Sequence, residues 1–225
     1  MLPAFSLTDE QRKAFENLIS NPSKASESLS KQEVIFDAFS ALAGSEKVLV
    51  EIKSKIPFSF SGTALFVCDA SNSKDVLLAL TKFCSLAGFT PVLVLFGSNF
   101  STISKSVRDS GFLGRFLILD CVSKSIAQVN ESDNVIFVDS MRNLTQMQIK
   151  VLNIIEKNPK CAFIFDSLQV LSLYHSEDVV LKFVYSISKL FRTKNTPAHF
   201  ITNQKKSMLK FSQFFDESIE LKKFY

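Results

Sequence analysis

From Lys47 to Asn203 the chain alternates short apolar runs with longer stretches whose apolar residues recur at helical spacing. The runs are VLVEI, TALFVC, PVLVLF, RFLILD, VIFV, CAFIFD and AHFIT, largely apolar at consecutive positions and rich in β-branched and aromatic residues. Strands buried on both faces have this composition, and the helices between them supply the crossovers that parallel strands require. The pattern therefore predicts an α/β fold, with a mainly parallel, doubly wound sheet and helices on both faces.

The first 45 residues are more polar and predict helices only. A first helix over Leu7–Ile19 begins with the cap signal Thr8-Asp9, and a second begins with a capping box, Ser30-x-x-Glu33. Their apolar faces would carry Phe15, Leu18 and Ile19 in the first helix, and Ile35, Ala38, Phe39 and Leu42 in the second. Gly44 is expected to close the second helix. We therefore expect a helical lead-in over residues 1–45 and an α/β domain over residues 46–225.

Composition and charge exclude several classes of protein. The 26 basic and 22 acidic residues give a net charge of +4, which supports a nucleic-acid partner only weakly. The four cysteines form no C-x-x-C pair, and three lie in strand-like runs, which favours buried reduced thiols in a cytoplasmic protein. The start of the chain lacks the pattern of a secretory signal, and no apolar run approaches the ~20 residues that span a bilayer. We expect a soluble cytoplasmic protein with no membrane partner.

Polar residues follow the predicted strands, and these strand ends are where an open parallel sheet binds ligands. They are Asp69, Gly97-Ser98, Asp120, Asp139, Asp166-Ser167 and Thr202-Asn203. The aspartates could form a metal or phosphate-transfer site, or they could cap helices and turns. The absence of a D-x-D spacing or an accompanying histidine favours caps and turns.

The stretch IPFSFSGTALFVCDASNSKDVLLALTKFCSLAGFTPVLVLF (56–96) resembles the opening of the RecA/KaiC family of P-loop proteins. RFLILDCVSK (115–124) is similar to the family's third strand, and CAFIFDSLQVL (161–171) is similar to its Walker B strand. Together with VVLKFVYSISKLFR (179–192), these stretches resemble archaeal RecA/KaiC-like proteins that lack an intact phosphate loop. The resemblance covers roughly residues 56–203 and implies a RecA-like sheet.

The same resemblance shows what is missing for ATP hydrolysis. A working phosphate loop reads G-x-x-x-x-G-K-[ST], in which glycines let backbone amides surround the phosphates and the hydroxyl holds Mg²⁺. The aligned stretch Cys68–Asp75 keeps Lys74, but Ser73 replaces the glycine before it and Asp75 replaces the hydroxyl residue. We expect a tighter turn than a phosphate loop, with Asp75 capping the helix and no bound anion.

A second requirement of the family fails independently. The family's catalytic glutamate follows the second strand, whereas this chain has Phe96-Gly97-Ser98-Asn99-Phe100 there. Asp166 stands at the Walker B position, where a turn or cap role is expected once the magnesium hydroxyl is gone. The sequence therefore predicts no catalytic residues, no metal and no cofactor, with Ser73, Lys74, Asp75 and Asp166 as relics.

The remaining candidate groups favour structural roles. His175 and His199 have no spacing typical of a metal site or catalytic triad, and His199 precedes a strand core, which favours a buried or edge histidine. The C-terminal stretch interleaves basic and aromatic residues: Lys205, Lys206, Lys210, Lys222 and Lys223 with Phe211, Phe214 and Phe215. Such interleaving can stack nucleic-acid bases. A final amphipathic element packed on the sheet is the preferred interpretation.

Two functions from different classes remain open. One is a non-catalytic RecA/KaiC-like protein that acts through protein–protein contacts, with a partner or with itself, in assembly or signalling. The other is a nucleotide or phosphate-ester binder that uses Lys74 and the strand-end aspartates in an altered pocket. Ligand-dependent thermal melting distinguishes the two.

Overall fold

The computed structural model describes residues 44–125, 134–203 and 210–222. The helices predicted before residue 44 lie outside the described residues.

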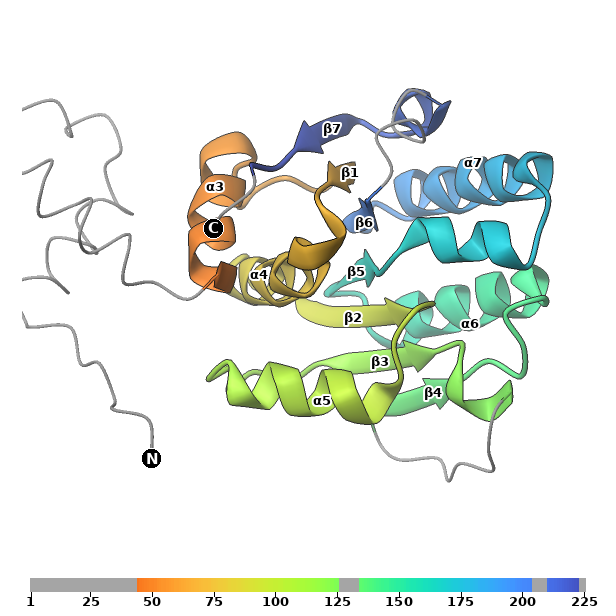
Figure 1. Cartoon of the computed structure of the whole chain (residues 1–225), viewed down its shortest axis with the longest axis horizontal. Helices are drawn as coiled ribbons and strands as arrows, with labels where there is room; N and C mark the ends of the chain where they lie inside the picture. The colour runs from red at the N-terminus through yellow and green to blue at the C-terminus, as the bar shows by residue number, and fades with distance from the viewer. Residues whose placement is uncertain (1–43, 126–133, 204–209, 223–225) are drawn as a thin grey trace, which may run out of the picture.

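Seven strands form one sheet in which every neighbouring pair is parallel (Figure 1). The strands are β1 (Thr63–Val67), β2 (Thr90–Leu95), β3 (Leu117–Asp120), β4 (Val135–Phe137), β5 (Cys161–Phe165), β6 (Ala198–Thr202) and β7 (Glu217–Glu220). Their order across the sheet is β4-β3-β2-β5-β6-β1-β7. The predicted parallel α/β sheet is confirmed.

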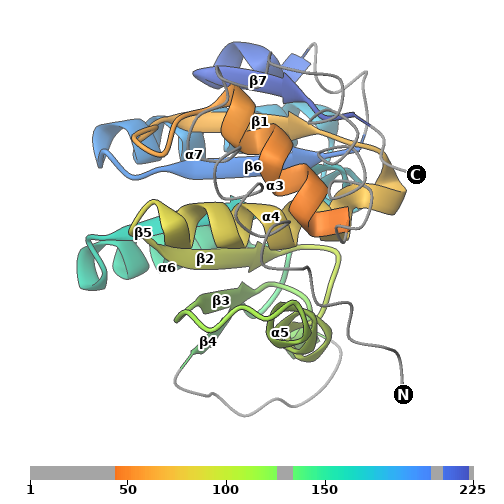
Figure 2. The same ribbon diagram turned by 90° about the vertical axis from the view of Figure 1, so that its left-hand side faces the viewer.

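Helices cover both faces of this sheet (Figure 2). The α-helices are α3 (Gly44–Lys55), α4 (Ser73–Leu86), α5 (Phe100–Asp109), α6 (Leu144–Lys157) and α7 (Glu177–Thr193). Short 3₁₀ turns are η2 (Ala70–Asn72), η3 (Ser123–Ser125), η4 (Leu168–Leu173) and η5 (Ser212–Phe214). Helices α3, α4 and α5 pack on one face, and α6 and α7 pack on the other. Every residue of β1, β5 and β6 is therefore buried, because each face of the sheet has its own apolar layer.

Phenylalanine fills the layer beneath α7. The rings of Phe165 on β5 and Phe200 on β6 stack with centroids 4.3 Å apart, and Phe163 lies 4.9 Å from Phe191 of α7. All four side chains are buried. These four phenylalanines therefore pack closely between the sheet and α7.

The run VLVEI, predicted as a strand, is part of helix α3. Val48, Leu49, Ile52 and Ile56 are buried, and their spacing places them on one helical face against α4. Five residues with apolar character at both spacings do not distinguish a strand from a helix, and Ile56, which completes the helical pattern, lies beyond the run. The prediction that Gly44 closes a helix was also wrong, since Gly44 is the first residue of α3.

The C-terminal segment completes one edge of the sheet. Strand β7 pairs with β1, and Phe211 and Phe215 are buried in the layer beneath α7. Asp216 joins three elements: its Oδ2 accepts hydrogen bonds from the Thr63 amide and hydroxyl, at 2.7 and 2.8 Å, and its Oδ1 accepts from Arg192 Nε at 2.9 Å. Partial burial alone would raise the pKa of Asp216, but these bonds and the guanidinium charge hold it below its usual value. The predicted packing of the C-terminal phenylalanines on the sheet agrees with this arrangement.

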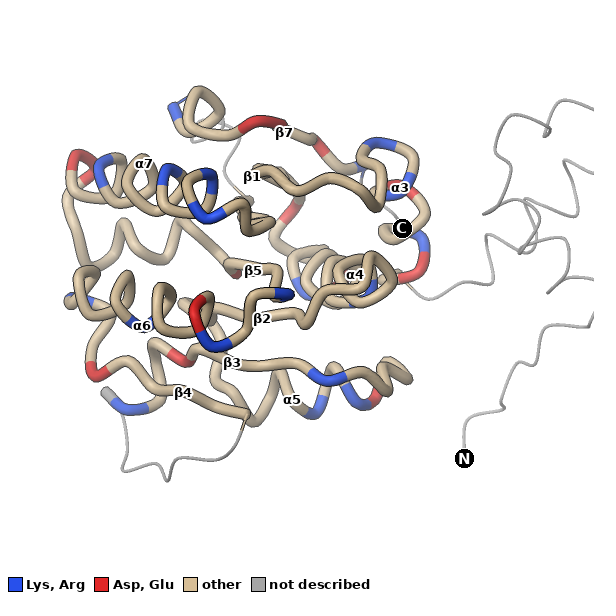
Figure 3. The backbone as a smooth tube through the Cα atoms, turned by 180° about the vertical axis from the view of Figure 1, so that it is seen from behind, with Lys and Arg blue, Asp and Glu red and all other residues tan. Residues whose placement is uncertain are grey.

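Helix α7 has acidic residues at its N-terminal end and a basic residue at its C-terminal end (Figure 3). Glu177 and Asp178 lie in its first turn and Arg192 in its last, which stabilises the partial charges of the helix ends. Within the described ranges, no helix has both the length and the apolar character needed to cross a membrane.

Candidate functional site

The carboxyl ends of β2 and β5 lie side by side near the centre of the sheet, and the Asp166 side chain joins them. Asp166 directly follows β5, and its Oδ1 accepts hydrogen bonds from the amides of Phe96 at 2.5 Å and Gly97 at 3.3 Å. Both amides belong to the turn that follows β2. The carboxyl group thus binds the protein's own backbone at the position where a ligand would approach the sheet.

Burial dominates the acidity of this group. Removal from water raises the pKa of Asp166 to about 7, the amide hydrogen bonds from residues 96–98 oppose that shift, and nearby Asp120 adds to it. Asp166 therefore carries a proton over much of the range in which an exposed aspartate is ionised. A protonated carboxyl is a poor ligand for Mg²⁺, which prefers charged oxygen.

Asp120, at the end of β3, is fully buried and accepts four hydrogen bonds. Its Oδ1 accepts from the amides of Val122 and Ser123, both at 2.8 Å. Its Oδ2 accepts from the Ser123 hydroxyl at 2.7 Å and from the amide of Phe100 at 2.9 Å. Phe100 is the first residue of α5, so this carboxyl group sits at a helix N-terminus, where the helix dipole favours it.

Together, Asp166 and Asp120 fix both ends of the turn between β2 and α5. This is the turn where the RecA/KaiC resemblance would place a catalytic glutamate. Here Asn99 caps α5, its side chain accepting from the Thr102 amide at 2.9 Å. The sequence expectation that strand-end aspartates act as caps and turn residues agrees with both carboxyl groups.

The phosphate-loop positions form a short 3₁₀ turn that leads directly into α4. After β1 come Cys68 and Asp69, then η2, and Ser73 already begins α4. The turn is closed by the Asn72 amide, which donates to the Asp69 carbonyl at 2.9 Å. Cys68 Sγ and Ser73 Oγ approach to 3.8 Å across it. The chain thus passes from β1 to α4 through a short 3₁₀ turn.

Lys74 and Asp75 both lie in the first turn of α4. Lys74 is exposed in the first turn of α4. Asp75 does not cap α4, because Asn72 occupies the N-cap position. The Asp75 carboxyl instead packs against Gly44 of α3, where a methyl group on Gly44 would overlap it. The predicted capping role was wrong because the helix begins earlier than the phosphate-loop alignment implied.

The polar residues that follow the other strands make contacts of their own. Asp69 is exposed, and Asp139 after β4 forms an ion pair with Lys124 and accepts from Gln146 Nε2 at 2.5 Å. Those two contacts, led by the Lys124 hydrogen bond, lower the pKa of Asp139. The Asn203 amide donates to Gln169 Oε1 at 3.4 Å. Over the described ranges, no three His, Cys, Asp or Glu side chains gather in a way that could hold a metal ion.

Both histidines have structural surroundings. His199 is buried on β6 among the rings of Phe60, Phe66 and Phe83, and burial lowers its pKa to about 4. This agrees with the predicted buried histidine. His175 Nε2 lies 3.0 Å from the Met141 carbonyl oxygen. All four cysteines are free and buried, and burial raises the pKa of Cys161 to about 11.

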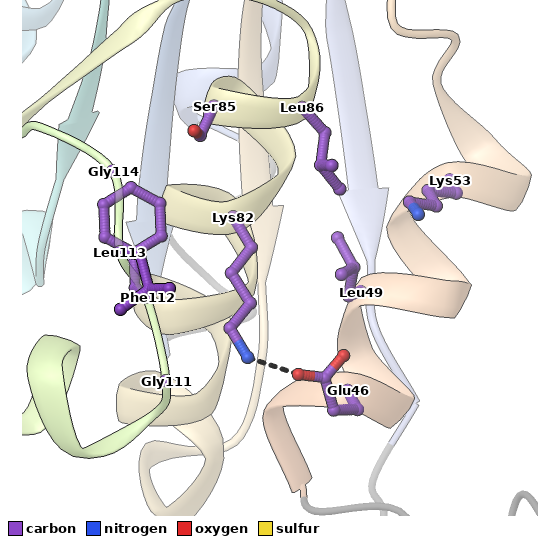
Figure 4. A pocket seen from close by; sticks show the side chains of 10 residues that line it. All are labelled: Glu46, Leu49, Lys53, Lys82, Ser85, Leu86, Gly111, Phe112, Leu113 and Gly114. Atoms are coloured by element: carbon purple, nitrogen blue, oxygen red, sulfur yellow. Dashed lines mark hydrogen bonds and ion pairs between the residues drawn. The ribbon is translucent and has the colours of Figure 1, made fainter. Parts of the chain in front are cut away.

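A groove of about 380 Å³ lies away from the strand ends, between α3, α4 and the turn before β3 (Figure 4). Its lining includes Leu49 and Lys53 from α3, Leu86 from α4, and Phe112 and Leu113 from the turn. None of these residues is among the candidate site residues predicted from the sequence. A signal was present in the apolar pair Phe112-Leu113 within a turn, where polar residues are usual.

Comparison of the sequence with protein-family models and with curated proteins gave no match. Comparison of the fold gave a KaiC-like protein from the hyperthermophilic archaeon Pyrococcus horikoshii, with a TM-score of 0.51 and 9% sequence identity over 72% of each chain. At this identity the likeness concerns the fold alone. The chain thus has a RecA-like α/β fold of the kind found in a KaiC-like protein.

Proposed function

We propose that this chain is a non-catalytic RecA/KaiC-like protein that acts by binding another protein or further copies of itself. The observation that carries the proposal is the use of the strand-end carboxyl groups. Asp166 and Asp120 bind the backbone of the β2–α5 turn, so neither is free to orient a metal ion or a water molecule. An ATPase of this fold needs such groups facing the nucleotide.

The phosphate-loop positions support the same proposal. Backbone amides surround a phosphate only where the loop is wide and flexible, which glycine permits. Here the amides of Asn72 and Ser73 donate within the turn, to the carbonyls of Asp69 and Ala70, and every residue of Cys68–Asp75 has a side chain. The stretch Cys68–Asp75 also holds two acidic residues, Asp69 and Asp75, against one lysine, Lys74. We therefore expect the turn to bind a triphosphate poorly.

Contacts with proteins are favoured by apolar side chains on the surface. On the α7 side of the molecule, Leu173 is 79% exposed, and Tyr174 and Val179 are also exposed. Large apolar side chains exposed close together in the chain are candidates for a contact with another protein. This surface supports the proposed class of function without identifying the partner.

Addition of Mg-ATP, ADP or sulfate is expected to leave the melting temperature unchanged. A ligand at about 100 times its Kd would add about 2.7 kcal/mol to the free energy of unfolding, which thermal melting detects readily. Differential scanning calorimetry with each ligand at millimolar concentration is the measurement, with sodium chloride at matched ionic strength as the control. A rise with nucleotide above that control would instead support the phosphate-ester binder.

Lys74→Ala is expected to change the free energy of unfolding by no more than ~0.5 kcal/mol, as exposed substitutions usually do. The reason is that Lys74 is exposed and its ammonium has no task in the proposed function. Lys105→Ala, at an exposed position of α5, is the matched control. Loss of cellular activity in Lys74→Ala alone, at unchanged melting temperature, would contradict the proposal.

A further inference from the structure

Helix α7 lies along the outside of the molecule, and its two ends carry opposite charges (Figure 3). Two of its charged side chains are bound within the chain. Glu177 forms an ion pair with Lys210, and Arg192 forms one with Asp216. Both partners belong to residues 210–222, so Glu177 and Arg192 already have their charges balanced by the C-terminal segment.

Three further charged side chains of α7 are exposed, and none forms an ion pair with another residue of 44–125, 134–203 or 210–222. They are Asp178, Lys182 and Lys189. Their spacings of four and seven residues place them on one face of the helix. Tyr185, which is 52% exposed, lies on the same face. The opposite face of α7 is buried against the sheet, so these four residues, the α7 ridge, point into solvent.

The α7 ridge is complementary in charge to a second copy of itself in antiparallel orientation. In a two-fold symmetric contact, a residue of one copy that faces a second residue of its partner is repeated with the copies exchanged. If Asp178 of one copy faces Lys189 of the other, a step of four residues forward on one helix matches a step of four back on the other. Lys182 then faces Tyr185. One register therefore gives every member of the ridge a favourable partner, in both copies.

The other arrangements of the two ridges bring like charges together. A parallel pair in register places Asp178 beside Asp178 and Lys182 beside Lys182, and an antiparallel pair with Lys182 opposite Lys189 places lysine on lysine. The register above instead forms two Asp178–Lys189 pairs and sets the Lys182 ammonium at a Tyr185 ring, whose face attracts cations. Antiparallel helices also bring the positive end of each helix dipole to the negative end of the other.

We propose that the α7 ridge is the contact surface for a second copy of this chain, with the two α7 helices antiparallel. The inference rests on the proposed function and names the partner. Exposed Leu173 and Tyr174 directly precede α7 and extend the surface at its acidic end. An interface of one helix from each copy falls below the about 1,200 Å² of a standard interface, so the dimer is expected to be weak.

The charge pairing is tested by sedimentation equilibrium of the full chain at micromolar to millimolar concentrations. Asp178→Lys replaces two attractive pairs by two like-charge pairs, and it is expected to raise the Kd of the dimer about tenfold. Adding Lys189→Asp restores both pairs with the charges exchanged, and is expected to return the Kd to near the wild-type value. Asp109→Lys makes the same charge change at the exposed end of α5, on the other face of the sheet, and is expected to leave the Kd unchanged.

The orientation is tested by disulfide formation, which the four native cysteines do not disturb because they are buried. A chain with Asp178→Cys is mixed with a chain with Lys189→Cys under mild oxidation. In the antiparallel dimer the two new thiols face each other, while the second Asp178–Lys189 pair stays intact. Either variant alone holds its two new thiols about 16 Å apart along the helix axes and is expected not to cross-link.

Three results would overturn the inference: a chain that stays monomeric at every concentration, a dimer that Asp178→Lys and Asp109→Lys weaken equally, and cross-linking of either cysteine variant alone as readily as of the mixture. All substituted positions are exposed, and far-UV circular dichroism with the melting temperature shows that each variant is folded. A monomer whose melting temperature ignores nucleotides would overturn this inference alone, and the proposed function would then require a different partner. Stabilisation by nucleotide would overturn the proposed function, whatever sedimentation shows.

Discussion

Asp120→Ala is expected to lower the free energy of unfolding by about 3–5 kcal/mol. The substitution removes one buried carboxyl group that accepts four hydrogen bonds, and it leaves the amides of Phe100, Val122 and Ser123 buried without their partner. Each unsatisfied buried donor costs about 1–3 kcal/mol, less whatever water recovers. Urea denaturation measures the loss, and hydrogen exchange at residues 97–102 measures the loosened β2–α5 turn.

Asp139→Ala is the matched control for this prediction. Asp139 also follows a strand, but it is exposed and its ion pair with Lys124 is on the surface. Exposed ion pairs contribute about 0–1 kcal/mol. An equal loss in the two variants would show that Asp120 does not hold the turn.

Asp166→Asn is expected to gain stability relative to the wild type as the pH rises from 4 to 8, by on the order of 4 kcal/mol. The pKa of Asp166 is 3.8 when unperturbed and about 7 in the folded protein, because burial penalises its charged form. Between these values the unfolded state has released the proton and the folded state still binds it. The wild type therefore loses stability as the pH rises through this window, and asparagine, which does not titrate, does not.

The titration of His199 changes the free energy of unfolding in the opposite direction with pH. Its contribution is the same in the wild type and in Asp166→Asn, so it cancels in their difference. Its folded pKa is about 4 against an ordinary 6.5, so the unfolded state binds the proton first and the protein loses stability as the pH falls from 6.5 to 4. Both proteins keep His199. Denaturant titrations of wild type and Asp166→Asn at pH 4, 5, 6, 7 and 8 isolate the contribution of Asp166. A constant difference across that range would show that Asp166 is ionised throughout.

Parallel strands and helices from β1 to β6 were predicted from the sequence because they depend on local patterns. Runs such as CAFIF and the helical stripe of residues 179–192 require only neighbours within a few residues to be recognised. The prediction of a strand at VLVEI was wrong. The local pattern of this run fits a strand and a helix equally, and its contacts with α4 favour the helix α3.

In the candidate site, too, some features follow from the sequence and others only from the tertiary structure. The sequence by itself determined that the phosphate loop lacks its glycines, that no acid follows the second strand, and that aspartates stand at the strand ends. Only the tertiary structure decided what those aspartates bind. The strand order brings Asp166 to an amide 70 residues earlier in the chain, and Asp120 to the first turn of a helix 20 residues earlier. Hydrogen bonds over such separations, and the groove formed by α3, α4 and the turn before β3, depend on how whole elements pack, which local periodicity does not encode.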